Sequence, residues 1–103
     1  MPDTLATTSD AQLLVERVQT GVRMEKRMVK VLKGLAEYLD MSLGELLEGI
    51  VLHAFADRTP FSAETLQRIG QLKDVYGMTY DVALSHRLTD DRTAQAEAPA
   101  EGG

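Results

Sequence analysis

Six basic side chains gather in one stretch of the chain, and their chemistry suits phosphate groups. Between residues 14 and 34 the sequence has six basic and two acidic residues, a local charge of +4, although the whole chain of 103 residues carries −5. Residues 35–58 have five acidic residues and one basic residue, a charge of −4. Such asymmetry is typical of a surface that faces nucleic acid, and it also occurs on an ordinary solvated helix face. The basic residues are Arg17, Arg23, Lys26, Arg27, Lys30 and Lys33.

Residues 18–24 alternate in character with a period of two. Arg17 immediately precedes this stretch, and Arg23 lies within it. In residues 18–24, apolar or β-branched residues alternate with others, which predicts a strand. One strand needs a partner for its backbone hydrogen bonds, and the sequence offers no second strong strand. A second copy of the chain, paired antiparallel across a two-fold axis, is the simplest partner. The inward set would be Val18, Thr20, Val22 and Met24, and the outward set Gln19, Gly21 and Arg23.

Two amphipathic helices are predicted to follow the strand. The first should begin near Glu25 or Lys26 and end near Asp40, a residue type that tolerates the left-handed conformation better than most. Ser42 and Glu45 form the Ser-x-x-Glu pattern of a capping box, so the second helix should begin there. The apolar faces contain Met28, Leu32, Leu35, Ala36 and Leu39 in the first helix, and Leu43, Leu46, Leu47, Ile50, Val51 and Ala54 in the second.

This order of elements resembles the ribbon-helix-helix family of repressors. The joint spacing of strand, first helix and Ser-led second helix, over about 38 residues, carries the resemblance. It implies a homodimer whose intermolecular antiparallel ribbon enters the major groove of double-stranded DNA. The residues concerned are Val22, Arg23, Met24, Met28, Leu32, Leu35, Ala36, Leu39, Met41, Ser42, Leu46, Leu47 and Ile50.

The resemblance also assigns roles to individual residues. The outward strand residues would contact bases, with Arg23 suited to guanine and Gln19 to adenine. Basic residues of the first helix and the free N–H groups at the start of the second would contact phosphates. The predicted function is therefore a sequence-specific DNA-binding transcriptional regulator, a repressor. Predicted base contacts are Gln19, Gly21 and Arg23; predicted phosphate contacts are Lys26, Arg27, Lys30, Lys33, Ser42, Leu43 and Gly44.

The C-terminal half predicts two further helices. Ser62 is a suitable N-cap for a third helix, and Gly77 a suitable stop. Thr79 is the expected N-cap of a fourth helix whose inner face would contain Ala83, Leu84 and Leu88. We therefore expect a mostly α-helical protein, a ribbon-helix-helix homodimer with an additional C-terminal helical hairpin. The expected parts are a flexible arm (1–17), the core (18–57), the accessory hairpin (59–89) and a disordered tail (90–103).

Other classes of function find little support in the sequence. It has no cysteine, no phosphate-cradling glycine loop, and no arrangement typical of a hydrolase or a metal site. We therefore expect no enzymatic activity, metal or cofactor, and a cytoplasmic protein without a membrane span. An alternative function stays open: a dimeric adaptor that does not bind DNA and holds a protein partner at residues 59–89. Gly21, which has no side chain to read a base, and the net charge of −5 favour that alternative.

Overall fold

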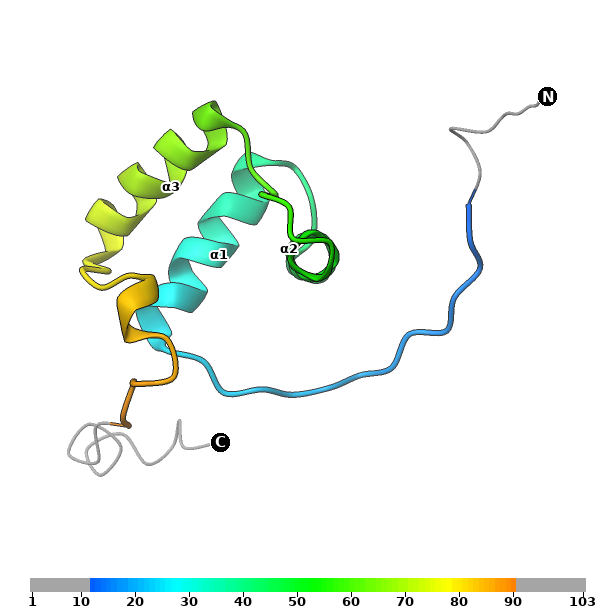
Figure 1. Cartoon of the computed structure of the whole chain (residues 1–103), viewed down its shortest axis with the longest axis horizontal. Helices are drawn as coiled ribbons and strands as arrows, with labels where there is room; N and C mark the ends of the chain where they lie inside the picture. Colours follow the sequence, from blue (N-terminus) through cyan, green and yellow to red (C-terminus); the bar gives the residue numbers. More distant parts are fainter. Residues whose placement is uncertain (1–11, 91–103) are drawn as a thin grey trace.

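Three α-helices and one short 3-10 helix make up the folded body. The computed structural model describes residues 12–90, and its elements are α1 (Lys26–Tyr38), α2 (Leu43–Phe55), α3 (Ala63–Tyr76) and η1 (Val82–Leu84). α1 lies at the centre, with α3 alongside it and α2 on its other side (Figure 1). Residues 12–24 lead into the start of α1 as an extended segment that is not part of any helix (Figure 1).

The predicted ribbon-helix-helix fold is wrong for this chain. Residues 18–24 have no strand assignment, and residues 12–90 contain no β-strand at all. The segment is extended, as its alternation predicts, but a strand exists only when another strand accepts and donates its backbone hydrogen bonds. No second strand is present in residues 12–90 to pair with this segment, so the described architecture is helical only.

The predicted accessory helical hairpin is also wrong. Its first helix forms as α3, but the predicted fourth helix is replaced by the three residues of η1. Asp81, and not Thr79, caps η1 by accepting the N–H of Ala83 at 3.0 Å. His86 has a left-handed backbone (φ 66°), which stops a right-handed helix immediately after η1. The expected flexible arm and tail lie largely in residues 1–11 and 91–103, outside the described range.

The starts predicted for the first two helices are confirmed. α2 begins with the predicted capping box: Ser42 Oγ accepts the Glu45 N–H at 3.1 Å, and the Glu45 carboxylate accepts the Ser42 N–H at 2.9 Å. Ser62 caps α3 in the predicted way, by accepting the N–H of Thr65 at 3.2 Å. Local capping chemistry thus sets the starts of α2 and α3.

All three helices end in the same type of turn. Asp40, Asp57 and Gly77 have positive φ angles of 60°, 55° and 71°. In each case the N–H of the next residue bonds the carbonyl five residues before it, at 3.0, 2.8 and 2.9 Å, which is the Schellman geometry. The end of α2 is therefore set by the left-handed Asp57.

The core is small, and α3 belongs to it. The buried apolar residues are Val31, Leu35, Ala36 and Leu46, with exposed fractions of 2–6%. Ile69 and Leu72 of α3 are partly buried and pack against three of these residues, Leu35, Ala36 and Leu46. Gly34 allows the close approach of α3, because a Cβ at this position would lie 3.0 Å from Leu72 Cδ2. α3 is therefore part of the same core as α1 and α2, not a separate layer.

Candidate nucleic-acid interface

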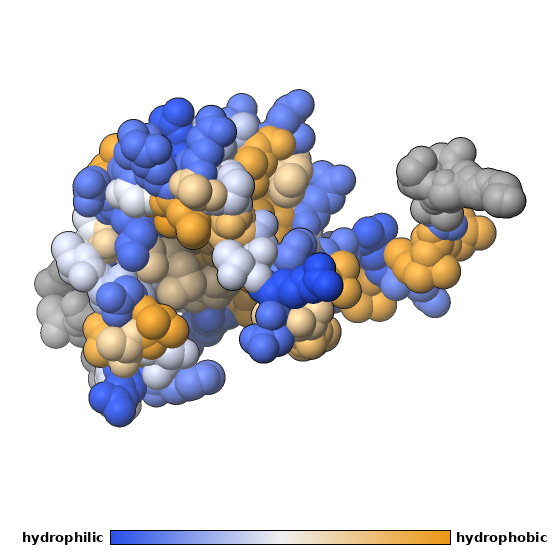
Figure 2. Space-filling model, turned by 45° about the horizontal axis from the view of Figure 1, so that its top comes forward, coloured by the Kyte–Doolittle hydropathy of each residue, from blue (hydrophilic) through white to orange (hydrophobic). Residues whose placement is uncertain are grey.

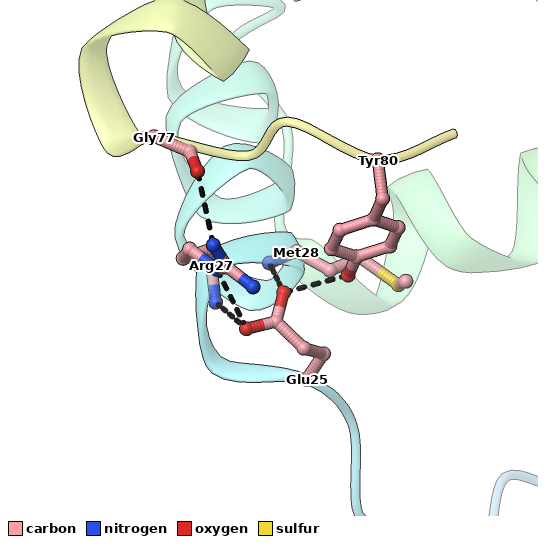
Figure 3. A network of polar contacts seen from close by, with 5 residues as sticks. All are labelled: Glu25, Arg27, Met28, Gly77 and Tyr80. Carbon is pink, nitrogen blue, oxygen red and sulfur yellow. Dashed lines mark hydrogen bonds and ion pairs between the residues drawn. The ribbon is translucent and has the colours of Figure 1, made fainter. Parts of the chain in front are cut away.

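A network of polar contacts fixes the point where the extended segment joins α1. The Glu25 carboxylate is the N-cap of α1 and accepts the N–H groups of Arg27 and Met28, each at 3.1 Å. The Tyr80 hydroxyl donates to the same carboxylate at 2.6 Å, from a position 55 residues later in the chain (Figure 3). These contacts join the start of α1 to the segment that follows α3.

Arg27 completes this network, and its side chain contacts three residues of it. Its Nε donates to Glu25 Oε2 at 3.0 Å and its Nη1 to the Gly77 carbonyl at 3.1 Å (Figure 3). Its guanidinium also lies over the Tyr80 ring, 5.6 Å from the centroid. A predicted phosphate contact therefore already has three partners in its own chain, although 45% of its side chain is exposed.

The contacts change the acid–base chemistry of two residues. Partial burial raises the pKa of Glu25. The hydrogen bonds from Tyr80, Arg27 and Met28 together lower it by more than burial raises it, so the pKa of Glu25 is about 2. For Tyr80, partial burial and the negative charge of Glu25 raise the pKa to about 12. At neutral pH the pair is thus a carboxylate bound by a neutral phenol, an arrangement that holds structure and does not exchange protons.

The extended segment carries the predicted base-contacting residues into solvent. Gln19, Gly21 and Arg23 are all exposed. No described atom lies within 4 Å of a Cβ built on Gly21, so the chain itself does not demand glycine there. Arg23 Nη2 pairs with Asp90 Oδ2 at 2.8 Å, and both side chains are more than 60% exposed. Apolar residues lie along the same segment beside polar ones (Figure 2).

A second ion pair connects this segment to α2. Arg17 donates from Nε and Nη2 to the two carboxylate oxygens of Glu48, both at 3.0 Å. The pairing raises the pKa of Arg17 and lowers that of Glu48. Both groups are exposed, so the pair orients the segment more than it stabilises the fold. The sequence does not reveal Glu48 as the partner of Arg17, because no pattern links residues 31 positions apart.

Three lysines form a stripe on an exposed side of α1. Lys26, Lys30 and Lys33 are spaced four and three residues apart and are all exposed, which places them on one side of the helix. The Lys30 ammonium lies 5.9 Å from the centre of the Tyr76 ring. Among the described residues, no hydrogen bond or ion pair engages Lys26 or Lys33. These two predicted phosphate contacts are thus available to an anion.

The predicted contacts at the start of α2 lie at the other end of α1. The 13 residues of α1 separate Ser42, Leu43 and Gly44 from Lys26 at the start of α1, roughly 20 Å at 1.5 Å per residue. Ser42 uses its hydroxyl and its N–H in the capping box, which also brings the Glu45 carboxylate to this helix end. Within one chain the structure therefore brings together Arg23 and the α1 lysines, but not Ser42, Leu43 and Gly44.

Comparisons with known proteins add no relative. No protein-family model, no curated protein and no solved structure matches the chain. Within residues 12–90, no helix has the length and apolar character that crossing a bilayer requires. The same residues contain no group of three or more His, Cys, Asp or Glu side chains that could hold a metal ion.

Sequence reasoning missed the two residues that organise this region. Glu25 is a poor N-cap by residue type, and Tyr80 is remote in sequence, so no spacing rule connects them. The only signal is that Glu25 immediately precedes a helix with no other acidic residue in its first turn.

Proposed function

We propose that the chain is a DNA-binding regulator of transcription, a repressor, that acts as a homodimer in the cytoplasm. The observation that carries the proposal is the position of the positive charge. Exposed Arg23 and the lysine stripe of α1 adjoin each other at the fixed junction of the extended segment with α1. Because residues 12–90 contain no strand, the proposal rests on the extended segment and not on a β-ribbon.

In this proposal the extended segment lies in a groove of double-stranded DNA. Arg23 and Gln19 contact base edges, because Arg can bond guanine and Gln adenine in bidentate fashion. Gly21 lets the backbone approach the DNA closely. Lys26, Lys30 and Lys33 contact phosphates and set the orientation without reading sequence.

The carboxylate partner of Arg23 does not prevent this. Arg23 and Asp90 are 70% and 63% exposed, and pairs this exposed contribute roughly 0–1 kcal/mol. A DNA phosphate or guanine edge can therefore replace Asp90 at little cost. The same holds for Arg17, whose partner Glu48 is 52% exposed.

Ser42, Leu43 and Gly44 enter the proposal as a second, separate contact. Leu43 and Gly44 present N–H groups at a helix N-terminus, which attract phosphate. Their distance from Arg23 means that they would touch a different stretch of backbone, or DNA bound mainly by another copy of the chain.

The experiment is a binding titration with selected DNA. Sites are first selected from a pool of random duplexes, and fluorescence anisotropy then compares the selected duplex with a scrambled one at about 50 and 200 mM salt. We expect tighter binding of the selected duplex and a steep loss of affinity with salt. If the two duplexes bind equally and salt has no effect, the function is instead the adaptor.

The adaptor is the second candidate, and one observation favours it. The body carries an apolar cavity of about 380 Å³ between α1, α3 and the residues that follow α3. Recognition of another protein would use this surface and would not need the basic residues. Loss of DNA binding in Arg23→Ala therefore separates the two candidates.

A further inference from the structure

The apolar cavity of the folded body is a groove that follows α3. Its lining begins with Phe61, just before α3, and continues through Ile69 to Met78, just after the helix. The 14 residues of α3 span roughly 21 Å at 1.5 Å per residue. The volume of about 380 Å³ is of the size that small-molecule sites have. The groove therefore suits one elongated apolar molecule.

The other walls of the groove come from three further parts of the chain. Met28 of α1, Ile50 of α2 and Leu84 of η1 all line it, and the buried core residue Leu35 lies at its floor. Tyr80 also lines the groove, and its hydroxyl bonds the N-cap of α1 at 2.6 Å. This bond holds the residues that follow α3 against α1, so the groove is formed without a ligand.

The exposed apolar residues of the extended segment do not fill the groove. Leu14 in this segment is 96% exposed, the highest fraction among the large apolar residues of the described chain. Arg17 holds the segment beside Glu48 of α2. Glu48 and Ile50 lie roughly 200° apart around the helix axis, at 3.6 residues per turn. At Arg17 the segment therefore lies on the side of α2 that faces away from the groove.

The polar side chains that line the groove favour an anionic ligand. They are Lys73, Tyr80, Asp81 and Ser85. The Asp81 carboxylate caps η1, and the Tyr80 hydroxyl belongs to the network at the start of α1, so both already have partners. Lys73 is half-buried, and neither its ammonium group nor the Ser85 hydroxyl has a hydrogen-bond or ion-pair partner among residues 12–90. Both groups can donate hydrogen bonds, and one is a cation, so they match a negatively charged acceptor.

We infer that the groove binds a free fatty acid, with the alkyl chain along α3 and the carboxylate at Lys73. The alkyl chain removes the apolar lining from water, and the carboxylate supplies the acceptor that Lys73 lacks. A fatty alcohol would bury the same chain without the charge, and a fatty amine would place a second cation beside Lys73. The charge of the head group thus distinguishes this site from a general apolar surface. The inference is independent of DNA binding.

NMR of the methionine methyl groups in the full chain locates the ligand. Met28 and Met78 line the groove, whereas Met41 is 38% exposed and does not. We expect decanoate, titrated without DNA, to shift the methyl signals of Met28 and Met78, to saturate below about 1 mM and to leave Met41 unchanged. Equal shifts of all three signals, or no shift of Met28 and Met78, overturn the inference.

Decanol and decylamine test the head group, because they carry the same alkyl chain as decanoate. We expect each to bind at least about tenfold more weakly than decanoate, the usual effect of losing a hydrogen bond to a charged group. Lys73→Gln should weaken decanoate binding by a similar factor and leave decanol binding unchanged. Lys33→Gln is the matched control, since Lys33 is an exposed lysine of α1 that does not line the groove.

Two results of this comparison reject the fatty-acid site. One is decanol binding as tightly as decanoate, and the other is wild-type affinity for decanoate in Lys73→Gln. Either result leaves the groove to a protein partner. If decanoate binds as expected but the DNA titration shows no preference and no salt effect, only the proposed function is rejected.

Discussion

The hydroxyl of Tyr80 donates a 2.6 Å hydrogen bond to the carboxylate of Glu25, the residue that caps α1. The bond joins the first and the last described parts of the folded body. It also determines the direction in which the extended segment leaves α1, because Glu25 is the first residue before the helix. The contact is therefore both a stabilising interaction and a positioning one.

Removal of this hydroxyl should measure its contribution. We expect Tyr80→Phe to lower the free energy of unfolding by about 1.5–3 kcal/mol, the usual value for a hydrogen bond to a charged group. Tyr38→Phe is the matched control, since the Tyr38 ring faces Arg68 at 4.6 Å and no described hydrogen bond involves its hydroxyl. Urea denaturation of the three proteins at one concentration makes the comparison. Equal stability of Tyr80→Phe and wild type would contradict the role given to the bond.

The stability of the protein should depend on pH through Glu25. Its pKa is about 2 in the folded chain against an ordinary value of 4.5, so the folded state favours the ionised form. This stabilisation is fully present above pH 4.5 and is lost as the pH falls from 4.5 through 2. Thermal melting across this range should show a smaller loss for Glu25→Gln than for wild type. Glu48→Gln is the control, and it should keep nearly the full slope because its ion pair is exposed.

Local chemistry accounts for what could be predicted of this fold from sequence. Ser42 and Ser62 cap helices by bonding N–H groups three residues ahead, so their neighbours in sequence suffice to identify them. The left-handed turn at Asp57 is equally local, but aspartate is less specific for such a turn than glycine, so the sequence does not mark the end of α2 clearly. Helix starts were therefore predicted more reliably than helix ends.

Contacts between distant residues explain the two failures. The alternation in residues 18–24 correctly indicates extended backbone, but a strand depends on a partner that lies outside one chain or does not exist. The spacing of Ala83, Leu84 and Leu88 is helical, yet Tyr80 is held by Glu25 and the backbone turns left-handed at His86. Neither the Tyr80–Glu25 hydrogen bond nor the left-handed backbone of His86 leaves a periodic signal in the sequence. For the same reason only part of the candidate site could be predicted from the sequence. Arg23 and Lys26 are close in the chain, but Glu25 and Tyr80 are 55 residues apart.

The close crossing of α1 and α3 should make Gly34 intolerant of a side chain. Gly70→Ala in α3 should raise the free energy of unfolding by about 0.5–1 kcal/mol, because a Cβ there meets open space and alanine favours helix. Gly34→Ala gains the same propensity but forces Leu72 to move, so we expect it to be less stable than Gly70→Ala by about 1 kcal/mol or more. The second change Leu72→Ala should remove that difference in a double-mutant cycle. A Gly34→Ala protein as stable as Gly70→Ala would show that the contact is soft.

Arg23 and Lys30 should differ in what they contribute to DNA binding. The Arg23 side chain is 70% exposed and contacts only a surface carboxylate among the partners identified for it, so Arg23→Ala should change stability by less than about 0.5 kcal/mol. It should weaken binding to the selected duplex by about 1–3 kcal/mol per lost base contact and leave the scrambled duplex much less affected. Lys30→Ala should weaken binding to both duplexes alike and reduce the slope of log affinity against log salt by about one per lost phosphate contact. Arg68→Ala removes one positive charge from α3, where the guanidinium lies over the Tyr38 ring, and controls for net charge. If Arg23→Ala and Arg68→Ala bind the selected duplex equally well, the extended segment does not read DNA sequence, and the apolar surfaces become the basis of the function.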